Sequence, residues 1–279
     1  MRNTETILIS GCPRSGTSWI HFLLGSHPNT VTCRETHVYD KYVGPLKDWF
    51  DRENQLKGAD GLSALFSEDE FINDILSPIV NTTFTRIGSG KKNNQVILEK
   101  TPGNILYHRL IHQIQPDAKI LFIARDPRAV YASFKAASKQ DWGGWTQKSV
   151  GQFCVSWNKY ADAYLAAKSY RSTDSLMCVR YEDMKTDGSK WLSMIYSWAG
   201  LKQTGDLVQQ ALEKNKIENL RNADKGSIQF DERADFYRVG KAYGWVDELG
   251  LDEIREIESN CMDLMTRMGY SAHTPVPSP

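Results

Sequence analysis

Five short stretches of the chain are rich in apolar or β-branched residues, and each is followed by a cluster of polar side chains. Such stretches predict buried strands, which we place at residues 7–9, 29–33, 96–98, 119–124 and 176–180. Segments in which apolar residues recur with helical spacing separate them. Strands that alternate with helices are typical of a parallel sheet that is covered on both faces.

The segments between the strands predict helices of ordinary length. Helical spacing covers residues 17–25, 68–84, 105–115, 128–138, 145–169, 189–199, 204–215 and 252–268. We expect Pro78 to kink or end the second of these helices, and we expect loops with short helices over residues 40–67. The predicted fold is therefore α/β with three layers, in which helices cover both faces of a central, mainly parallel five-stranded sheet. One domain is expected over residues 1–272, with a disordered Pro-rich tail at 273–279.

Every predicted strand ends at a polar cluster. The clusters are Gly11–Ser18, Arg34–His37, Glu99–Asn104, Arg125–Arg128 and Tyr181–Asp183. Ligands of open parallel sheets bind beyond the carboxyl ends of the strands. The sequence thus predicts one ligand site at that edge of the sheet.

The first cluster has the composition of an anion-binding loop. A strand, a turn that contains Gly11 and Gly16, and a helix N-terminus point backbone N–H groups at one spot. Arg14 adds a full charge there. The glycine spacing matches the phosphate loop of P-loop NTPases, which favours a P-loop NTPase-like fold, but Thr17 stands where that loop has its lysine. This difference argues against an ordinary kinase or ATPase, and a turn whose glycines serve only the bend is the structural alternative.

The composition of the chain limits the classes of binding partner and the cellular compartment that we expect. Lys+Arg and Asp+Glu both number 34, so the net charge is zero, and nothing indicates nucleic-acid binding or a polybasic membrane patch. The five cysteines lack the spacing of a disulfide framework or a zinc site. No leader and no membrane span is expected. We expect a cytoplasmic protein.

Four motifs together resemble the sulfotransferases that use 3′-phosphoadenosine 5′-phosphosulfate (PAPS). They are Pro13-Arg-Ser-Gly-Thr-Ser-Trp19, Glu99-Lys-Thr-Pro102, Arg125-Asp-Pro-Arg-Ala-Val-Tyr-Ala-Ser133 and Arg180-Tyr-Glu-Asp183. The resemblance extends from residue 7 to about residue 245. The version of the first loop found here is more similar to tyrosylprotein and carbohydrate sulfotransferases than to the steroid and phenol enzymes, which have Lys where Arg14 stands.

The resemblance implies a set of cofactor-binding residues. Those for the 5′-phosphosulfate are Pro13, Arg14, Ser15, Gly16, Thr17 and Ser18. Trp19 and Tyr181 would lie near the adenine, and Arg125 and Ser133 would bind the 3′-phosphate. Arg238, Gly240 and Lys241 resemble a segment that closes over the same phosphate. We expect two separate basic pockets, built around Arg14 and Arg125, at opposite ends of the nucleotide.

The catalytic base is expected after the second strand. Steroid- and phenol-type relatives use a histidine after a Lys-Thr pair, but Pro102 follows that pair here. Glu35 matches the glutamate that acts as base in the tyrosylprotein and heparan-type enzymes. His37 is the alternative, because an imidazole exchanges protons near neutral pH. Lys100 would stabilise the leaving phosphate, position Glu35 or pair with Glu99.

The reaction implied is in-line transfer of a sulfuryl group from PAPS to a hydroxyl or amine, without a metal. A small metabolite is the expected acceptor, with carbohydrate or protein tyrosine as alternatives. Two other classes remain open: an atypical P-loop kinase that uses ATP and Mg²⁺, and a non-catalytic anion-binding module. Residues 38–95 and 138–150 are expected on the acceptor side, with Trp142 and Trp145 as an aromatic lid. His108 and His112 are read as surface histidines. The oligomeric state cannot be read from the sequence.

Overall fold

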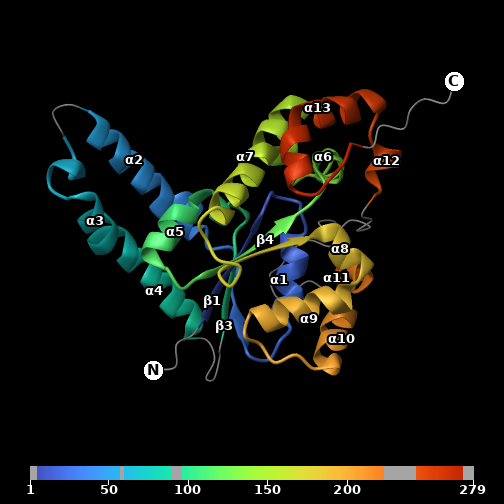
Figure 1. The fold of residues 1–279 in the computed structure, drawn as a ribbon, viewed down its shortest axis with the longest axis horizontal. Coiled ribbons are helices and arrows are strands. Elements are labelled where there is room, and N and C mark those ends of the chain that lie inside the picture. The colour runs from blue at the N-terminus through green and yellow to red at the C-terminus, as the bar shows by residue number, and fades with distance from the viewer. Residues whose placement is uncertain (1–4, 57–59, 90–95, 223–242, 273–279) are drawn as a thin grey trace.

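A computed structural model describes residues 5–56, 60–89, 96–222 and 243–272 of the chain (Figure 1). Short 3₁₀- and π-helical segments carry the label η. The elements up to residue 100 are β1 (Glu5–Gly11), α1 (Thr17–Gly25), β2 (Thr30–Thr32), η1 (Val38–Val43), α2 (Gly44–Gln55), η2 (Leu62–Ala64), α3 (Glu68–Glu70), η3 (Phe71–Leu76), α4 (Ser77–Gly88) and β3 (Val96–Lys100).

The second part of the chain continues the alternation of helices and strands. Its elements are η4 (Pro102–Tyr107), α5 (His108–Ile114), β4 (Lys119–Ala124), α6 (Pro127–Ala137), η5 (Gly144–Thr146), α7 (Val150–Lys168), β5 (Leu176–Arg180), α8 (Tyr181–Thr186), α9 (Gly188–Trp198), α10 (Gly205–Lys214), α11 (Ile217–Asn222), α12 (Trp245–Glu248) and α13 (Leu251–Arg267).

The strands form one parallel five-stranded sheet with the order β2-β3-β1-β4-β5. The predicted α/β fold class is confirmed, and all five predicted strands are present. Strand β1 lies in the centre, where Ile7 pairs with Leu98 of β3 and Ile9 with Leu121 of β4. Because the chain leaves β1 toward one side of the sheet and later returns to the other, a ligand site is expected beyond the carboxyl end of β1.

Alternate residues of each strand point to opposite faces of the sheet. Ile7 and Ile9 pack in one apolar cluster with residues of α1, α9 and α10. Leu8 belongs to a second cluster, formed with residues of α4, α5, α6, α7 and α13. Figure 1 shows the same division, with α9 and α10 on one side of the strands and α7 and α13 on the other. A sheet buried on both faces leaves only its strand ends to carry a site.

Two helical predictions need correction. The helical run that begins at Glu68 does not end at Pro78 but continues to Gly88, since Pro78 lies in the first turn of α4, directly after the π-helical η3. The predicted loops of residues 40–67 contain a twelve-residue helix, α2. Residues 273–279, predicted as a tail, lie outside the described residues.

The thiols and the helix lengths complete the picture. All five cysteines are free, as their spacing predicted. Within the described ranges, we find no helix with the length and apolar character that crossing a bilayer requires.

Candidate active site

The loop between β1 and α1 opens onto a cavity of about 590 Å³ at the carboxyl ends of the strands. Most residues predicted to bind or react line this one cavity. They are Pro13, Arg14, Gly16, Thr17, Ser18, Trp19, Glu35, His37, Arg125, Ser133 and Tyr181. Their roles remain predictions, but their convergence is a property of the structure.

The loop adopts a tight, left-handed path before α1 begins. Ser15 N–H donates to the carbonyl of Cys12 at 3.0 Å, and the φ angles of Arg14 and Gly16 are 69° and 96°. Helix α1 then starts at Thr17 without a side-chain cap. The N–H groups of its first turn therefore have no partner within the helix, which makes this terminus an anion site.

Ser15 is placed differently from its neighbours in the loop. Its side chain is fully buried, its hydroxyl has no hydrogen-bond partner among the described residues, and its N–H is used in the turn. Ser15 is also absent from the residues that line the cavity. The N–H of Ser15 thus holds the turn, and its role in binding the 5′-phosphosulfate stays a prediction.

Gly16 lets an aromatic ring lie directly against the loop. A Cβ at this position would come 2.5 Å from Cδ2 of Tyr181. Tyr181, the first residue of α8, meets Trp19 edge to face, with 5.6 Å between ring centroids. The Arg125 guanidinium lies over the Tyr181 ring, with 4.3 Å from Cζ to the ring centroid. Trp19 and Tyr181 both line the cavity beside the loop.

We expect Gly16→Ala to destabilise the protein by about 1–3 kcal/mol, because the left-handed backbone and the Tyr181 ring both oppose a side chain. Thermal unfolding followed by circular dichroism measures this loss. Gly205→Ala is the matched control, since Gly205 begins α10 and no atom lies within 4 Å of an added Cβ there. Equal melting temperatures for the two variants would contradict the tight contact.

Arg14 and Arg125 belong to one wall and not to two separate pockets. Nη1 of Arg125 donates to the carbonyl of Arg14 at 2.9 Å, and Nε of Arg14 donates to Oγ of Ser133 at 3.2 Å. The expectation of separate pockets was wrong, because both arginines line the same cavity and Arg125 bonds to the Arg14 backbone. Both arginines and Ser133 form a continuous basic surface along the cavity.

Arg128, three residues beyond Arg125, has a different environment. Its guanidinium is buried between Asp126, at 2.7 Å, and Glu258 of α13, at 2.5 Å. It also stacks on Trp245, with 4.2 Å from Cζ to the ring centroid. This ion-paired cluster fixes α13 and α12 to the start of α6, so Arg128 holds the wall of the cavity in place.

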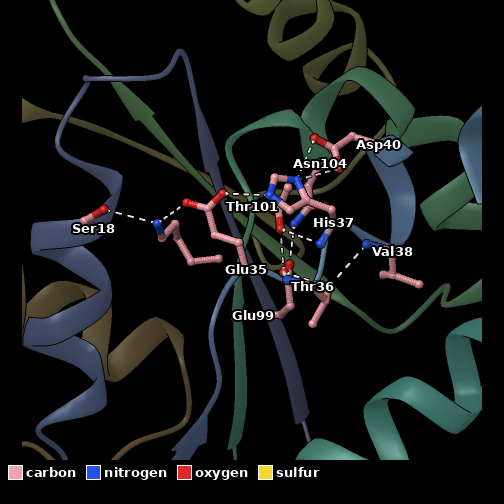
Figure 2. A network of polar contacts seen from close by, with 10 residues as sticks. Ser18, Glu35, Thr36, His37, Val38, Asp40, Glu99, Thr101 and Asn104 are labelled. Atoms are coloured by element: carbon pink, nitrogen blue, oxygen red, sulfur yellow. Dashed lines mark hydrogen bonds and ion pairs between the residues drawn. The ribbon is translucent and has the colours of Figure 1, made fainter. Parts of the chain in front are cut away.

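A chain of charged side chains crosses the floor of the cavity. Nζ of Lys100 donates to Oγ of Ser18 at 3.1 Å and also contacts Oε1 of Glu35. Oε2 of Glu35 lies 3.2 Å from Nε2 of His37, and Nδ1 of His37 lies 3.0 Å from Oδ1 of Asp40. Figure 2 shows Glu35, His37 and Asp40 in this order, with Ser18 on the far side of Glu35. Of the alternatives for Lys100, the structure shows contact with Glu35.

Glu99 holds the loop that carries these groups. Its carboxylate is fully buried and accepts hydrogen bonds from Thr36 N–H and hydroxyl, from the Thr101 hydroxyl and from the Asn104 amide, at 2.6 to 3.1 Å. Figure 2 shows these bonds around Glu99. A buried carboxylate with this many donors is a fixed anchor. It joins the segment after β2 to the end of β3.

Burial sets the charge state of the groups around this floor. Burial, with a smaller effect of the Lys100 charge, lowers the pKa of His21 to about 3, so this histidine is neutral below the site. Burial raises the pKa of Tyr160, and the nearby Cys12, Asp40 and Glu35 raise it further. The Tyr160 phenol, which lines the cavity, is therefore protonated at neutral pH.

Other predicted residues have mixed outcomes. Trp145 lines the cavity and Trp142 lies over the Arg14 guanidinium, 5.4 Å from Cζ to the ring centroid; a lid movement stays a prediction. His108 is buried and bonds to the Tyr170 hydroxyl at 2.6 Å, so its assignment to the surface was wrong. Arg238, Gly240 and Lys241 lie outside the described residues. In the part of the chain that the structure covers, no three His, Cys, Asp or Glu residues are grouped to hold a metal.

Sequence reasoning assigned no individual role to Asp40 or to Trp245, both of which line this cavity. Asp40 lies in the π-helical η1, whose pattern is not periodic, and Trp245 opens the four-residue α12. Trp245 is buried, and its indole N–H has no hydrogen-bond partner among the described residues. One feature of the sequence could have identified Asp40: it lies three residues after His37, a candidate catalytic residue.

Comparison with known proteins agrees with this geometry. The family profile described as "Sulfotransferase family" matches residues 6–205. Protein-tyrosine sulfotransferase of Drosophila melanogaster is 21% identical over 99% of this chain and 54% of that protein. Protein-tyrosine sulfotransferase 1 of Danio rerio is 21% identical over 99% of this chain and 75% of that protein. The chain thus spans about half the length of the Drosophila protein.

Solved structures show the same architecture. The mouse sulfotransferase SULT7A1 complexed with PAP, the desulfated product of PAPS, superimposes with a TM-score of 0.61 at 15% identity, over 94% of this chain and 85% of that chain. The sulfotransferase domain from the curacin biosynthetic pathway gives a TM-score of 0.59 at 15% identity, over 98% of this chain and 100% of that chain. At these identities the likeness establishes a shared fold.

Proposed function

The chain belongs to the sulfotransferase family, as its motifs predicted, and on that premise we propose that it transfers the sulfuryl group of PAPS to a hydroxyl or amine of an acceptor. One observation carries the proposal: the anion-binding loop and Glu35 line the same cavity. Sulfuryl transfer needs both parts, a fixed positive environment for the leaving phosphate and a group that takes the acceptor's proton.

The walls of the cavity fit a nucleotide with two phosphate groups. Arg14 and the first turn of α1 would hold the 5′-phosphosulfate, Arg125 and Ser133 the 3′-phosphate, and the rings of Trp19 and Tyr181 the adenine. The buried indole N–H of Trp245, which lines the cavity without a partner among the described residues, supplies a further donor for an anionic ligand. PAPS brings the reactive sulfuryl group, so the protein has only to bind, orient and remove a proton.

The side chains at the floor of the cavity would carry out the acid–base chemistry. Glu35 is the proposed base for the acceptor's proton. Lys100 contacts both Glu35 and Ser18, and it therefore lies between the base and the anion-binding helix terminus. Its ammonium group orients Glu35 and stabilises the negative charge that develops at that terminus.

The acceptor is proposed to be a small metabolite. A tyrosyl peptide is the second candidate, because the curated relatives are protein-tyrosine sulfotransferases. PAP release from PAPS, measured with phenols, alcohols, sugars, amines and an acidic tyrosyl peptide, separates the two. Turnover with the peptide alone would favour the second candidate.

We expect PAP to bind at least about tenfold more tightly than ATP with Mg²⁺, a difference of about 1.4 kcal/mol, because ATP lacks the 3′-phosphate for Arg125 and Ser133. Isothermal titration calorimetry of both nucleotides measures this ratio. Tighter binding of ATP with Mg²⁺ would favour the kinase alternative. Binding of PAP without turnover on any acceptor would favour the anion-binding module.

A further inference from the structure

Asp40 and His37 form a hydrogen-bonded pair beside Glu35, and the sulfuryl transfer described so far gives Asp40 no role. Nδ1 of His37 faces both carboxylate oxygens of Asp40, at 3.0 and 3.2 Å. Nε2 of the same ring faces Oε2 of Glu35 at 3.2 Å. The imidazole thus has a carboxylate at each nitrogen (Figure 2).

These positions determine where the protons lie. A carboxylate oxygen and a ring nitrogen without hydrogen are both acceptors, so the contact of 3.2 Å between Nε2 and Oε2 requires one shared proton. The contacts with Asp40 require a second proton on Nδ1. When the shared proton is absent, Asp40 keeps the remaining ring proton on Nδ1. Nε2 and Oε2 are then two acceptors that face each other.

The backbone holds this arrangement at a conformational cost. His37 has a φ angle of 54°, and its N–H donates to the Thr101 hydroxyl at 3.2 Å. Gly103 leaves the space that the Asp40 carboxylate fills, since a Cβ there would lie 2.6 Å from Oδ2. A non-glycine residue with a left-handed backbone is strained, and such residues tend to occur at functional sites.

Resting on the proposed function, we propose that Glu35 and His37 act as one composite base and that Asp40 is the positioning residue that sets the tautomer of His37. The O–H or N–H bond of the acceptor breaks, and its proton becomes the one shared between Oε2 and Nε2. The electron pair of that bond forms the new bond to sulfur. The bond from sulfur to the phosphate oxygen breaks, and that oxygen keeps its electron pair. The shared proton then passes to solvent.

Four other side chains around the imidazole carry a charge or can exchange a proton. Lys100 of β3 contacts Glu35, and Tyr160 of α7 is protonated because burial raises its pKa. Lys41 of η1 and Glu248 of α12 also line the cavity. Glu35 is the carboxylate at Nε2 and Asp40 is the carboxylate at Nδ1, so Asp40 is the group that holds a ring proton on Nδ1.

The state of His37 can be measured without an acceptor. In ¹⁵N-histidine NMR of the whole protein, the signal that disappears in His37→Gln identifies the ring. We expect the neutral ring of the wild type to carry its proton on Nδ1. In Asp40→Asn the amide N–H donates to Nδ1, so the ring proton moves to Nε2. Asp48→Asn, which alters a carboxylate of α2 bonded to Tyr107, is the control. An unchanged tautomer in Asp40→Asn would overturn the proposal.

Turnover supplies the second measurement. With an acceptor that the wild type sulfates, Asp40→Asn should lower kcat about 100-fold, within the range for loss of acid–base catalysis. KM and PAP affinity should stay unchanged. Asp40→Glu should recover part of kcat. Wild-type kcat in Asp40→Asn would overturn the composite base and leave the proposed function intact. A wild-type protein that sulfates no acceptor would overturn the proposed function, and the NMR result would then decide whether Asp40 sets the tautomer of His37.

Discussion

Glu35→Gln is expected to lower kcat by about 10²- to 10⁴-fold, the usual contribution of a general base, and to leave PAP affinity unchanged. Glutamine has the shape of glutamate and still accepts a hydrogen bond from Lys100, but its amide cannot take a proton. The nucleotide wall is built from other residues, so binding is independent of this change. Steady-state kinetics on the acceptor found in the panel, together with calorimetry of PAP, measures both quantities.

Two comparisons make the Glu35 result decisive. Glu68→Gln removes a carboxylate that pairs with Lys47 outside the cavity, and it should keep wild-type kcat. His37→Gln should also lower kcat, because the composite base needs both groups. A fully active Glu35→Gln beside an inactive His37→Gln would assign the base to His37 alone and leave the sulfotransferase assignment intact.

Arg125→Leu is expected to weaken PAP binding by about 10- to 100-fold, since hydrogen bonds to charged groups contribute about 1.5–3 kcal/mol. The loss has two causes. The guanidinium charge disappears from the nucleotide wall, and the Arg14 carbonyl loses the donor that holds the loop. Calorimetry of PAP at low and high salt measures the effect, and the salt dependence should decrease with the charge.

Two further variants separate the effect of the Arg125 charge from the effect of the guanidinium geometry. Arg125→Lys keeps the charge without the planar fork and should recover only part of the affinity. Arg267→Leu removes an exposed guanidinium of α13 and should bind PAP as the wild type does. Equal PAP affinity in Arg125→Leu and Arg267→Leu would exclude Arg125 from the nucleotide site.

The sheet and the place of the cavity could be predicted because both depend on local patterns. Buried parallel strands read as short apolar runs, and parallel strands bring their carboxyl ends to one edge. Glu35 follows β2 and Lys100 ends the neighbouring strand β3, so their contact could be expected from the sequence. The charge on Glu99 was read only as part of a polar strand end, although it anchors the loop.

The remaining features depend on contacts that leave no period in the sequence. The length of helix α2 was not predicted, because only Phe50 among its larger apolar residues is buried, whereas Leu46 and Trp49 are 44% and 60% exposed. The single basic wall was missed because it depends on hydrogen bonds of Arg14 with Arg125 and Ser133, more than a hundred residues away in sequence. The position of Asp40 depends on a π-helical turn and on a glycine more than sixty residues away in sequence.

Among the described residues, Arg14 and His37 are the two non-glycine positions with positive φ, and both line the cavity. Glycine or asparagine would adopt the same backbone with less strain. A library sorted only for heat resistance should therefore enrich these replacements, and the survivors would be robust proteins without nucleotide affinity or turnover. Selection for folding and selection for catalysis therefore favour different residues at positions 14 and 37.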